Sequence, residues 1–427
     1  MRLGRRAFLN SLAASVMAPA VLRLARADAP QVTLKLHHFF SSVSSGHEKF
    51  LVPWARQVAA QSAGRIRIDI FPSMQLGGAP AQLFDQGRDG LADIVWAVPG
   101  YTPGRFGRIE AFELPFLPSR RALVNSKALQ DFAATNLRDE FSEVHPICFS
   151  CRDRSVVHTN RTVRAVSDLR GLRLHVPNRL AAETVHALGA TAVTVPVPQV
   201  PMAVSSHAIE GCLMPWDAVP ALRLNDLLKQ HTDFAESALS TSTFVLAMNK
   251  SAYDRLPADL KAVIDKNSGQ ETAGMAGAMW DVEAKMVADL VRERGDPITV
   301  LAEDEVANWR AATRSVVSLW IKQMKERKTD GGKLLASLHA LIGKYASEPE
   351  PQTQPPREPR LSEPAEPHLT EPRVTEPKVV SQPPKPTRPP QAPQTAAEVA
   401  RPKADMPAAA PRPAAKRAPL KELDIPL

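Results

Sequence analysis

Val32-Thr33-Leu34-Lys35-Leu36 alternates apolar and polar side chains, and the stretch that it opens decides the fold. Residues 66–70 repeat this period of two, which is typical of β-strands. The apolar residues between these strands, and again in residues 81–88, fall at helical spacing, and the apolar run 94–98 closes the stretch. The order strand-helix-strand-helix-strand predicts an α/β fold with a mainly parallel sheet covered on both faces.

A second block repeats this order further along the chain. Residues 172–176 are strand-like, 181–188 helix-like and 192–195 strand-like again. The segment 144–159, which precedes the block, is predicted to be one strand. Because a core from residue 28 to residue 346 exceeds the usual size of a single domain, we expect two α/β lobes.

The stretch from residue 253 to residue 345 has helical spacing. One apolar stripe is predicted to be the core face of a long helix packed across both lobes, and not a cofactor site. Its members are Met275, Met279, Val282, Met286 and Leu290.

The N-terminus has the pattern of an export peptide. Arg5 and Arg6 precede an uncharged stretch from residue 7 to residue 22, and Ala25-Arg26-Ala27 offers a cleavage site between small residues. We expect a twin-arginine signal over residues 1–27; the general secretory route and an uncleaved anchor are the alternatives. The peptide holds five arginines and no acid, so the formal net charge of +8 falls to +3 without it. No clustered basic face is visible, which argues against nucleic-acid binding.

The C-terminal segment differs in composition from the rest. Residues 347–427 hold 21 of the 39 prolines and no aromatic residue, so they are predicted to form a disordered, extended arm and not a core. Such an arm serves as a spacer or as a docking arm for another periplasmic component, or it is a solvated appendage.

The motifs of catalytic and metal sites are absent or incomplete. Cys148 and Cys151 spell CxxC without a second pair, and with Cys212 they are predicted to be buried apolar residues. His47-Glu48 begins the HExxH zinc pattern, but Leu51 stands in place of the second histidine. We find no phosphate-binding loop and no nucleophile elbow, so no metal, cofactor or catalytic activity is expected.

Several stretches, in order, resemble the solute-binding subunit of TRAP (tripartite ATP-independent periplasmic) transporters of the DctP type. The resemblance covers roughly residues 32–345. The stretches are His38-Phe39-Phe40, residues 71–78, 89–94, 99–106, 113–116, 168–174 and 188–190, Met214-Pro215-Trp216 and residues 248–250.

The resemblance implies a two-lobed periplasmic-binding-protein fold that closes over a small organic anion in a cleft between the lobes. It implies a carboxylate ligand, permease subunits of the TRAP type as partners and a periplasmic location. The expected organisation is lobe I at 28–152, lobe II at 153–240, lobe-crossing strands and C-terminal helices at 241–346 and the tail at 347–427.

The residues that the resemblance places in the binding site come from both lobes. Three positions depart from the family pattern: Glu210 replaces the customary aspartate, His207 replaces a glycine, and His175 stands where members carry an arginine that clamps the carboxylate with two hydrogen bonds. Arg154 and Arg179 are candidates to supply the missing charge, or they are surface arginines; Trp216 is a wall of the cleft or a core tryptophan. The expected site residues are His38, Phe39, Trp96, Tyr101, Arg154, His175, Arg179, Met214 and Trp216.

Two further predictions concern His175 and the class of protein. With an ordinary pKa of about 6.5, His175 would be cationic at acidic pH and would then bind a carboxylate more tightly. Besides the receptor, a scaffold or signalling protein with a degenerate pocket stays open, as does a periplasmic enzyme whose residues meet from distant loops.

Overall fold

The computed structural model describes residues 30–349 and contains two sheets. The predicted export peptide, and the predicted tail beyond residue 349, lie outside the described residues. The first sheet has the order β2-β1-β3-β10-β4, and the second has the order β11-β9-β5-β8-β6-β7. The strands are β1 (Val32–His38), β2 (Ile66–Phe71), β3 (Ile94–Ala97), β4 (Val144–Cys151), β5 (Ser155–Thr159), β6 (Arg173–His175), β7 (Thr191–Val193), β8 (Gly211–Pro215), β9 (Gln230–Phe234), β10 (Thr243–Asn249) and β11 (Ile298–Leu301).

The α-helices lie between these strands and after them, and we call each sheet with its helices a lobe. The helices are α1 (Val52–Gln61), α2 (Leu83–Asp89), α3 (Ala122–Asn136), α4 (Arg179–Ala187), α5 (Val200–Ser205), α6 (Ala218–Ala221), α7 (Lys250–Asp254), α8 (Ala258–Lys266), α9 (Gln270–Glu293), α10 (Glu303–Glu326) and α11 (Gly331–Ala346).

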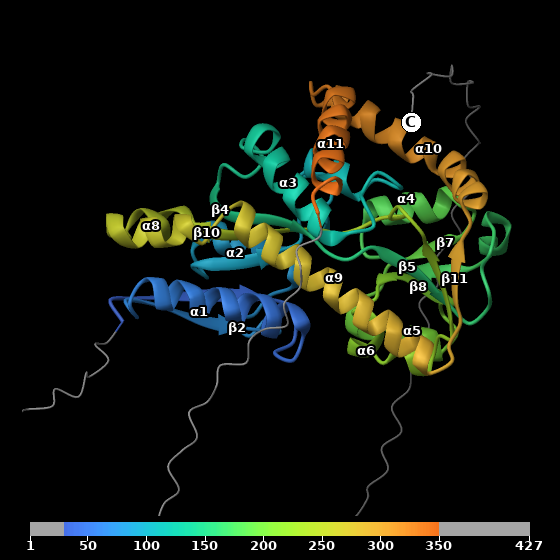
Figure 1. Cartoon of the computed structure of the whole chain (residues 1–427), viewed down its shortest axis with the longest axis horizontal. Coiled ribbons are helices and arrows are strands. Elements are labelled where there is room, and N and C mark those ends of the chain that lie inside the picture. The colour runs from blue at the N-terminus through green and yellow to red at the C-terminus, as the bar shows by residue number, and fades with distance from the viewer. Residues whose placement is uncertain (1–29, 350–427) are drawn as a thin grey trace, which may run out of the picture. The chain divides into compact units, whose positions relative to one another are not determined.

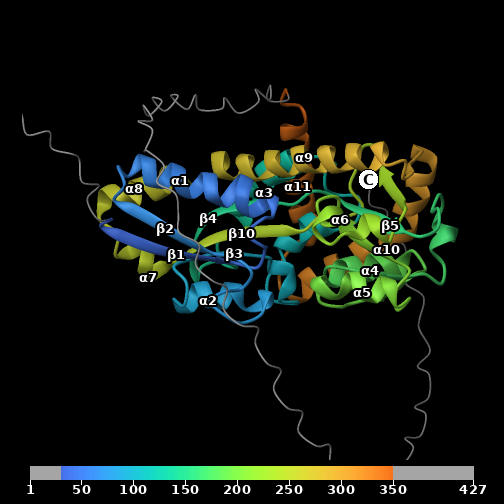
Figure 2. The ribbon, with the colours of Figure 1, turned by 90° about the horizontal axis from the view of Figure 1, so that it is seen from below.

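The predicted mainly parallel sheets are confirmed. In the first sheet β10 runs antiparallel to its neighbours β3 and β4, and in the second β5 runs antiparallel to β8 and β9. Helices cover both faces of the first sheet: Val95 and Ala97 of β3 pack into the cluster that contains α2, while the alternate residues Ile94 and Trp96 pack into the one that contains α1. Figure 2 shows α1 and α2 on opposite sides of this sheet.

The prediction of one strand over residues 144–159 is wrong. The segment forms two strands, β4 in the first sheet and β5 in the second, and the chain crosses between the sheets at residues 152–154. It returns over residues 235–242, from β9 to β10, and the two crossings lie side by side. The amide of Arg152 donates to the carbonyl of Ser242 (2.9 Å), and the amide of Ser155 to that of Ser240 (2.8 Å).

The predicted long helix between the lobes is α9, which Figure 1 shows running from the strands of the first sheet to those of the second. Its first half packs into a cluster of the first lobe and its second half against Val156 and Trp216 of the second lobe. A second helix also connects the lobes: α10 buries Trp309 in the second lobe and Trp320 in the first.

The predicted core face of α9 is only partly right. Met279 is buried, but Val282, Met286 and Leu290 are 52%, 49% and 47% exposed. Small residues form much of the buried face, because α3 approaches closely: a Cβ on Gly277 would lie 2.7 Å from the carbonyl oxygen of Ala122. The buried residues of α9 are Thr272, Ala273, Ala276, Gly277, Met279, Trp280, Glu283, Ala284, Val287, Ala288 and Val291.

The three cysteines are free and buried, as predicted for apolar core residues. Burial raises the pKa of Cys148 to about 12, so this thiol is not a nucleophile near neutral pH. Between residues 30 and 349, no helix combines the length and the apolar character that crossing a membrane requires.

Candidate functional site

The candidate site lies where strand ends from both lobes meet. In the first lobe β1 ends at His38 and β4 at Cys151; in the second β6 ends at His175 and β8 at Pro215. Ligands of α/β sheets bind beyond the carboxyl ends of their strands. Side chains that follow these ends contact one another across the lobes.

Aromatic rings of the first lobe form one cluster at this place. Phe40 stacks on Phe39 (4.3 Å between ring centroids) and lies 5.1 Å from Trp96, which lies 6.2 Å from Trp280 of α9. Gly46 is required beside them, since a Cβ there would come within 2.8 Å of the Trp96 ring. Tyr101 joins the cluster, with its ring 5.8 Å from that of Phe39. The predicted residues Phe39, Trp96 and Tyr101 are therefore brought together.

Arg152, which the sequence did not single out, lies against this cluster. Its guanidinium is 5.2 Å from the ring centroid of Phe40 and 5.1 Å from that of Trp280. It makes a bidentate ion pair with Asp217 of the second lobe, in which Nε donates to Oδ1 (3.0 Å) and Nη2 to Oδ2. The two side chains are only 13% and 11% exposed. The Arg152 cation thus lies between two aromatic rings and pairs with a carboxylate of the other lobe.

Arg154 faces inward and not toward the aromatic cluster. It donates to both carboxylate oxygens of Asp233 (2.8 and 2.6 Å) and to Asp153 (3.0 Å), and it is 8% exposed. Burial raises the pKa of Asp153 to about 7, although Arg154 lies beside it. Of the two alternatives for Arg154, that of a surface arginine is wrong: the side chain is buried and ties the chain crossing to β9.

Arg179 joins the two lobes at the start of α4. It donates to Glu110 of the first lobe (2.7 Å). Beside it Asn178, the N-cap of α4, donates to Glu113 at 2.9 Å. Glu113 also accepts from the amide (2.9 Å) and hydroxyl (2.7 Å) of Thr243, and burial raises its pKa to about 7. Glu113 and Asn178 are further interlobe residues that the sequence did not mark.

His175 is buried without any hydrogen-bond partner. It is 1% exposed, and neither ring nitrogen has a partner within the described chain. Burial lowers its pKa to about 4, and the nearby carbonyl of Val193 only partly offsets this. The expected pKa of about 6.5 is therefore wrong, because the imidazole is shielded from water and faces no carboxylate that would favour its charged form.

The remaining predicted residues lie in the cores around the site. His38 shares a hydrogen bond with His47 (3.0 Å between Nε2 and Nδ1), and burial lowers its pKa to about 3. Met214 packs in the apolar cluster that contains Cys212. Trp216 packs beneath α9 and lies 5.3 Å from the imidazole of His158, an arrangement that matches a core tryptophan.

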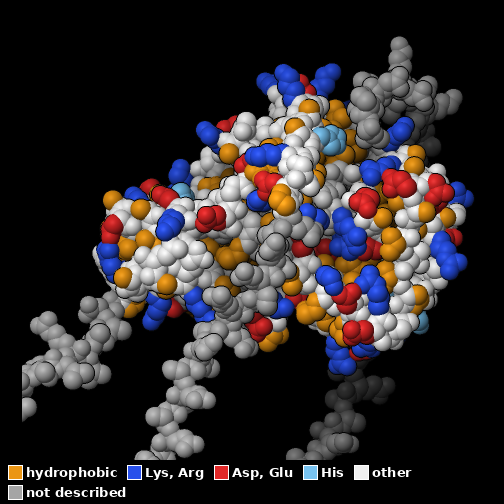
Figure 3. Space-filling model, viewed as in Figure 1, with side chains coloured by type: hydrophobic (Ala, Val, Ile, Leu, Met, Phe, Trp, Pro, Cys, Tyr) orange, Lys and Arg blue, Asp and Glu red, His pale blue; other side chains and the backbone are white. Residues whose placement is uncertain are grey.

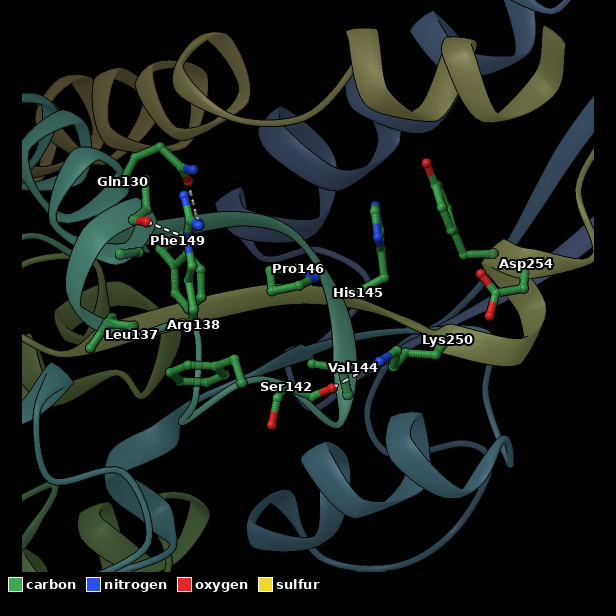
Figure 4. Close-up of a pocket in the computed structure, with 14 residues that line it drawn as sticks. Gln130, Leu137, Arg138, Ser142, Val144, His145, Pro146, Phe149, Lys250 and Asp254 are labelled. Carbon is green, nitrogen blue, oxygen red and sulfur yellow. Dashed lines mark hydrogen bonds between the residues drawn. The ribbon is translucent and has the colours of Figure 1, made fainter. Parts of the chain in front are cut away.

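A separate cavity of about 500 Å³ lies elsewhere in the first lobe, between α3, β4 and α7. Figure 4 shows Arg138, His145 and Lys250 at its wall. His145 stacks on Tyr253 (3.6 Å), and Lys250 donates to the carbonyl of Ser142 (3.2 Å). None of the predicted site residues lines it.

The distribution of surface charges and the placement of possible metal ligands were the remaining features that could mark a site within residues 30–349. Basic and acidic side chains are interspersed on the face that Figure 3 shows. Among residues 30–349, no three His, Cys, Asp or Glu side chains are placed to hold a metal ion together.

Comparison with known proteins identifies relatives of the whole described region. The family model described as bacterial extracellular solute-binding protein, family 7, matches residues 37–323. A curated relative, an uncharacterized protein of Sinorhizobium fredii, is 25% identical over 323 residues; the match covers 73% of this chain but only 57% of that protein.

Two solved structures are more similar. A TRAP solute-binding protein from Rhodoferax ferrireducens T118, in complex with copurified benzoate, is 36% identical; the match has a TM-score of 0.71 and covers 74% of this chain and 98% of that chain. A marine metagenome TRAP solute-binding protein specific for aromatic acid ligands, with 3-hydroxybenzoate, is 38% identical; here the TM-score is 0.72 and the shares are 74% and 99%.

Proposed function

Because the chain belongs to family 7 of the bacterial extracellular solute-binding proteins, we propose that it is a periplasmic receptor that binds a small aromatic carboxylate between its lobes and delivers it to a TRAP-type transporter. Two similar proteins are described with benzoate and with 3-hydroxybenzoate, which supports this ligand class. The location, the export signal over residues 1–27 and the permease partner are part of the proposal. A receptor of this kind performs no catalysis.

Arg152 carries the proposal. An aromatic carboxylate presents a flat apolar ring and a planar anion, and it is recognised best by aromatic walls beside a fixed cation. Arg152 offers a rigid guanidinium fork between Phe40 and Trp280, and its pairing with Asp217 shows that the fork fits a carboxylate in this place. We assign the ligand's carboxylate to Arg152, where it replaces Asp217.

The other predicted residues take supporting roles in this arrangement. Phe39, Trp96 and Tyr101 are the apolar wall on the first lobe, with His38 behind them. His175 belongs to the facing side of the second lobe, and Met214 and Trp216 pack in the core that supports it. Arg154 and Arg179, each paired with an acid, hold the crossing segment and the start of α4 in position.

Closure follows from the two chain crossings. We propose that lobe I (28–152, completed by β10) and lobe II (153–240, completed by β11) rotate about residues 152–154 and 235–242, while the helices within 241–346 bend with them. Ligand bound to both lobes favours the closed form, and this form is what the transporter recognises.

A thermal-shift and calorimetry series tests the function. Benzoate should raise the Tm of the purified full chain, because a ligand at about 100 times its Kd stabilises by roughly 2.7 kcal/mol. Succinate and a neutral aromatic amide, benzamide, should not. Arg152→Met should weaken benzoate binding by about 100-fold, whereas Arg108→Met, on the surface of the same lobe, should leave it unchanged.

Two outcomes would contradict this. Stabilisation by succinate but not by benzoate would reject the aromatic class. No stabilisation by any carboxylate would favour the scaffold with a degenerate pocket.

A further inference from the structure

His175 is a buried polar side chain for which the described residues supply no hydrogen-bond partner at either ring nitrogen. It ends β6, and Asn178, three residues later, contacts Glu113 of the other lobe. The end of β6 therefore lies beside the contact between the two lobes. A polar group that is 1% exposed with both nitrogens unpartnered is costly in a finished fold, and its partner then comes from a bound molecule.

The surroundings of His175 decide which hydrogen-bonding group it seeks. A neutral imidazole has one N–H donor and one nitrogen lone pair. The carbonyl of Val193 lies near the ring, but it already accepts from the amide of Val176 and makes no hydrogen bond with His175. Its oxygen favours the tautomer whose N–H points toward it, and this leaves the other ring nitrogen with a free lone pair as an acceptor.

A lone pair cannot bind a carboxylate, which has only acceptors unless it is protonated. A hydroxyl group, by contrast, can donate a hydrogen bond to the lone pair of the imidazole nitrogen. We propose that His175 accepts a hydrogen bond from a hydroxyl on the ligand's ring, so that the preferred ligands are hydroxylated aromatic carboxylates. This inference rests on the proposed function: Arg152 holds the carboxylate, and His175 accepts the hydrogen bond from a hydroxyl on the opposite side of the ring.

The position also explains a departure from the family pattern. An arginine at residue 175 presents donors only and attracts an anion. A neutral histidine does not attract the anion, but it selects a ligand with a hydroxyl donor. The cation that binds the anion is then Arg152 of the other lobe. Sites built to hydrogen-bond a ligand hydroxyl discriminate against analogues that lack it, because the buried partner is then left unsatisfied.

The test is calorimetry on the full chain, freed of ligand by unfolding and refolding. The probes are benzoate, its 2-, 3- and 4-hydroxy derivatives and the matching methoxybenzoates, which keep the oxygen but lack the donor. At least one hydroxybenzoate should bind about tenfold tighter than benzoate and than its methoxy analogue. His175→Phe should abolish this ratio, and His175→Gln, which retains an acceptor oxygen, should keep part of it. His339→Gln, at an exposed position of α11, is the matched control and should change nothing.

The ratio of two affinities measured on one variant is insensitive to partial misfolding. Equal affinity of the wild type for benzoate and all hydroxybenzoates would overturn the inference and leave the proposed function intact. A ratio that persists in His175→Phe would also overturn it. Failure of every aromatic carboxylate to bind would overturn both.

Discussion

Replacing Asp217 with asparagine tests whether Asp217 competes with the ligand for Arg152 or orients Arg152 for the ligand. In the structure Asp217 occupies the guanidinium fork that we assign to the ligand. A carboxylate ligand must then exchange places with an internal carboxylate, which gains little. Asparagine keeps the size and one acceptor oxygen but removes the charge, so the ligand competes with a weaker partner.

The magnitude follows from the geometry. The pair is bidentate and nearly nine-tenths buried, and hydrogen bonds to charged groups contribute about 1.5–3 kcal/mol. Because one neutral bond remains, we expect Asp217→Asn to strengthen benzoate binding by about 1.5 kcal/mol, roughly tenfold in Kd. Without ligand the variant should be less stable by about 1–2 kcal/mol, since Arg152 loses its counter-charge.

Calorimetry gives the Kd, and urea unfolding without ligand gives the stability. Glu110→Gln is the matched control, because it breaks the interlobe pair with Arg179 in the same manner. If Asp217→Asn weakens binding, Asp217 orients Arg152 and does not compete with the ligand. If Glu110→Gln alone strengthens binding, Arg179 is the carboxylate anchor.

Four further predictions concern other parts of the chain. Arg154→Met should cost about 3–5 kcal/mol in urea unfolding, because it leaves Asp153 buried without its cation and Asp233 with only the more distant Arg120 at 3.8 Å; a loss below 1 kcal/mol would refute that role. The pKa of His175 is lower in the folded than in the unfolded state, so the unfolded state binds more protons as pH falls from about 6.5 toward 4. Between pH 8 and pH 5.5 the free energy of unfolding of the wild type should therefore fall by about 1 kcal/mol more than that of His175→Phe. Equal losses in the two proteins would show that the pKa of His175 is ordinary. Deleting residues 347–427 should lower stability by no more than the surface pair of Glu348 with Lys127, about 0–1 kcal/mol, and leave affinity unchanged; a larger drop in Tm would mean that the segment packs on the core. Replacing Arg5 and Arg6 with lysine should block export through the twin-arginine route, and secretion of the variant would indicate the general secretory route instead.

Periodicity predicted the sheets and their helices but not where the chain changes lobes. Residues 144–159 keep strand-like spacing across the crossing, so periodicity alone predicts a single strand there. The charged run Arg152-Asp153-Arg154 was the available signal, because three charges in succession do not fit inside a buried strand. Once the strand is divided, Arg152 follows the end of β4 at the site, whereas Arg154 begins the second lobe.

Hydrophobicity alone also misplaced the buried face of α9. Methionine and leucine ranked as core residues, yet the helix packs through alanine and glycine because α3 comes too close for longer side chains. The pKa of His175 was out of reach for a similar reason: its value depends on which residues enclose the ring, and these come from distant parts of the chain.

The interleaving of the two sheets has a consequence for synthesis. β10 lies between β3 and β4, so β4 has no neighbouring strand in its sheet until residue 249 has left the ribosome. The second sheet gains its edge strand β11 only with residue 301. The first sheet is therefore incomplete until residue 249 has emerged and the second until residue 301 has, and up to then the early strands are exposed to proteases and to chaperone capture.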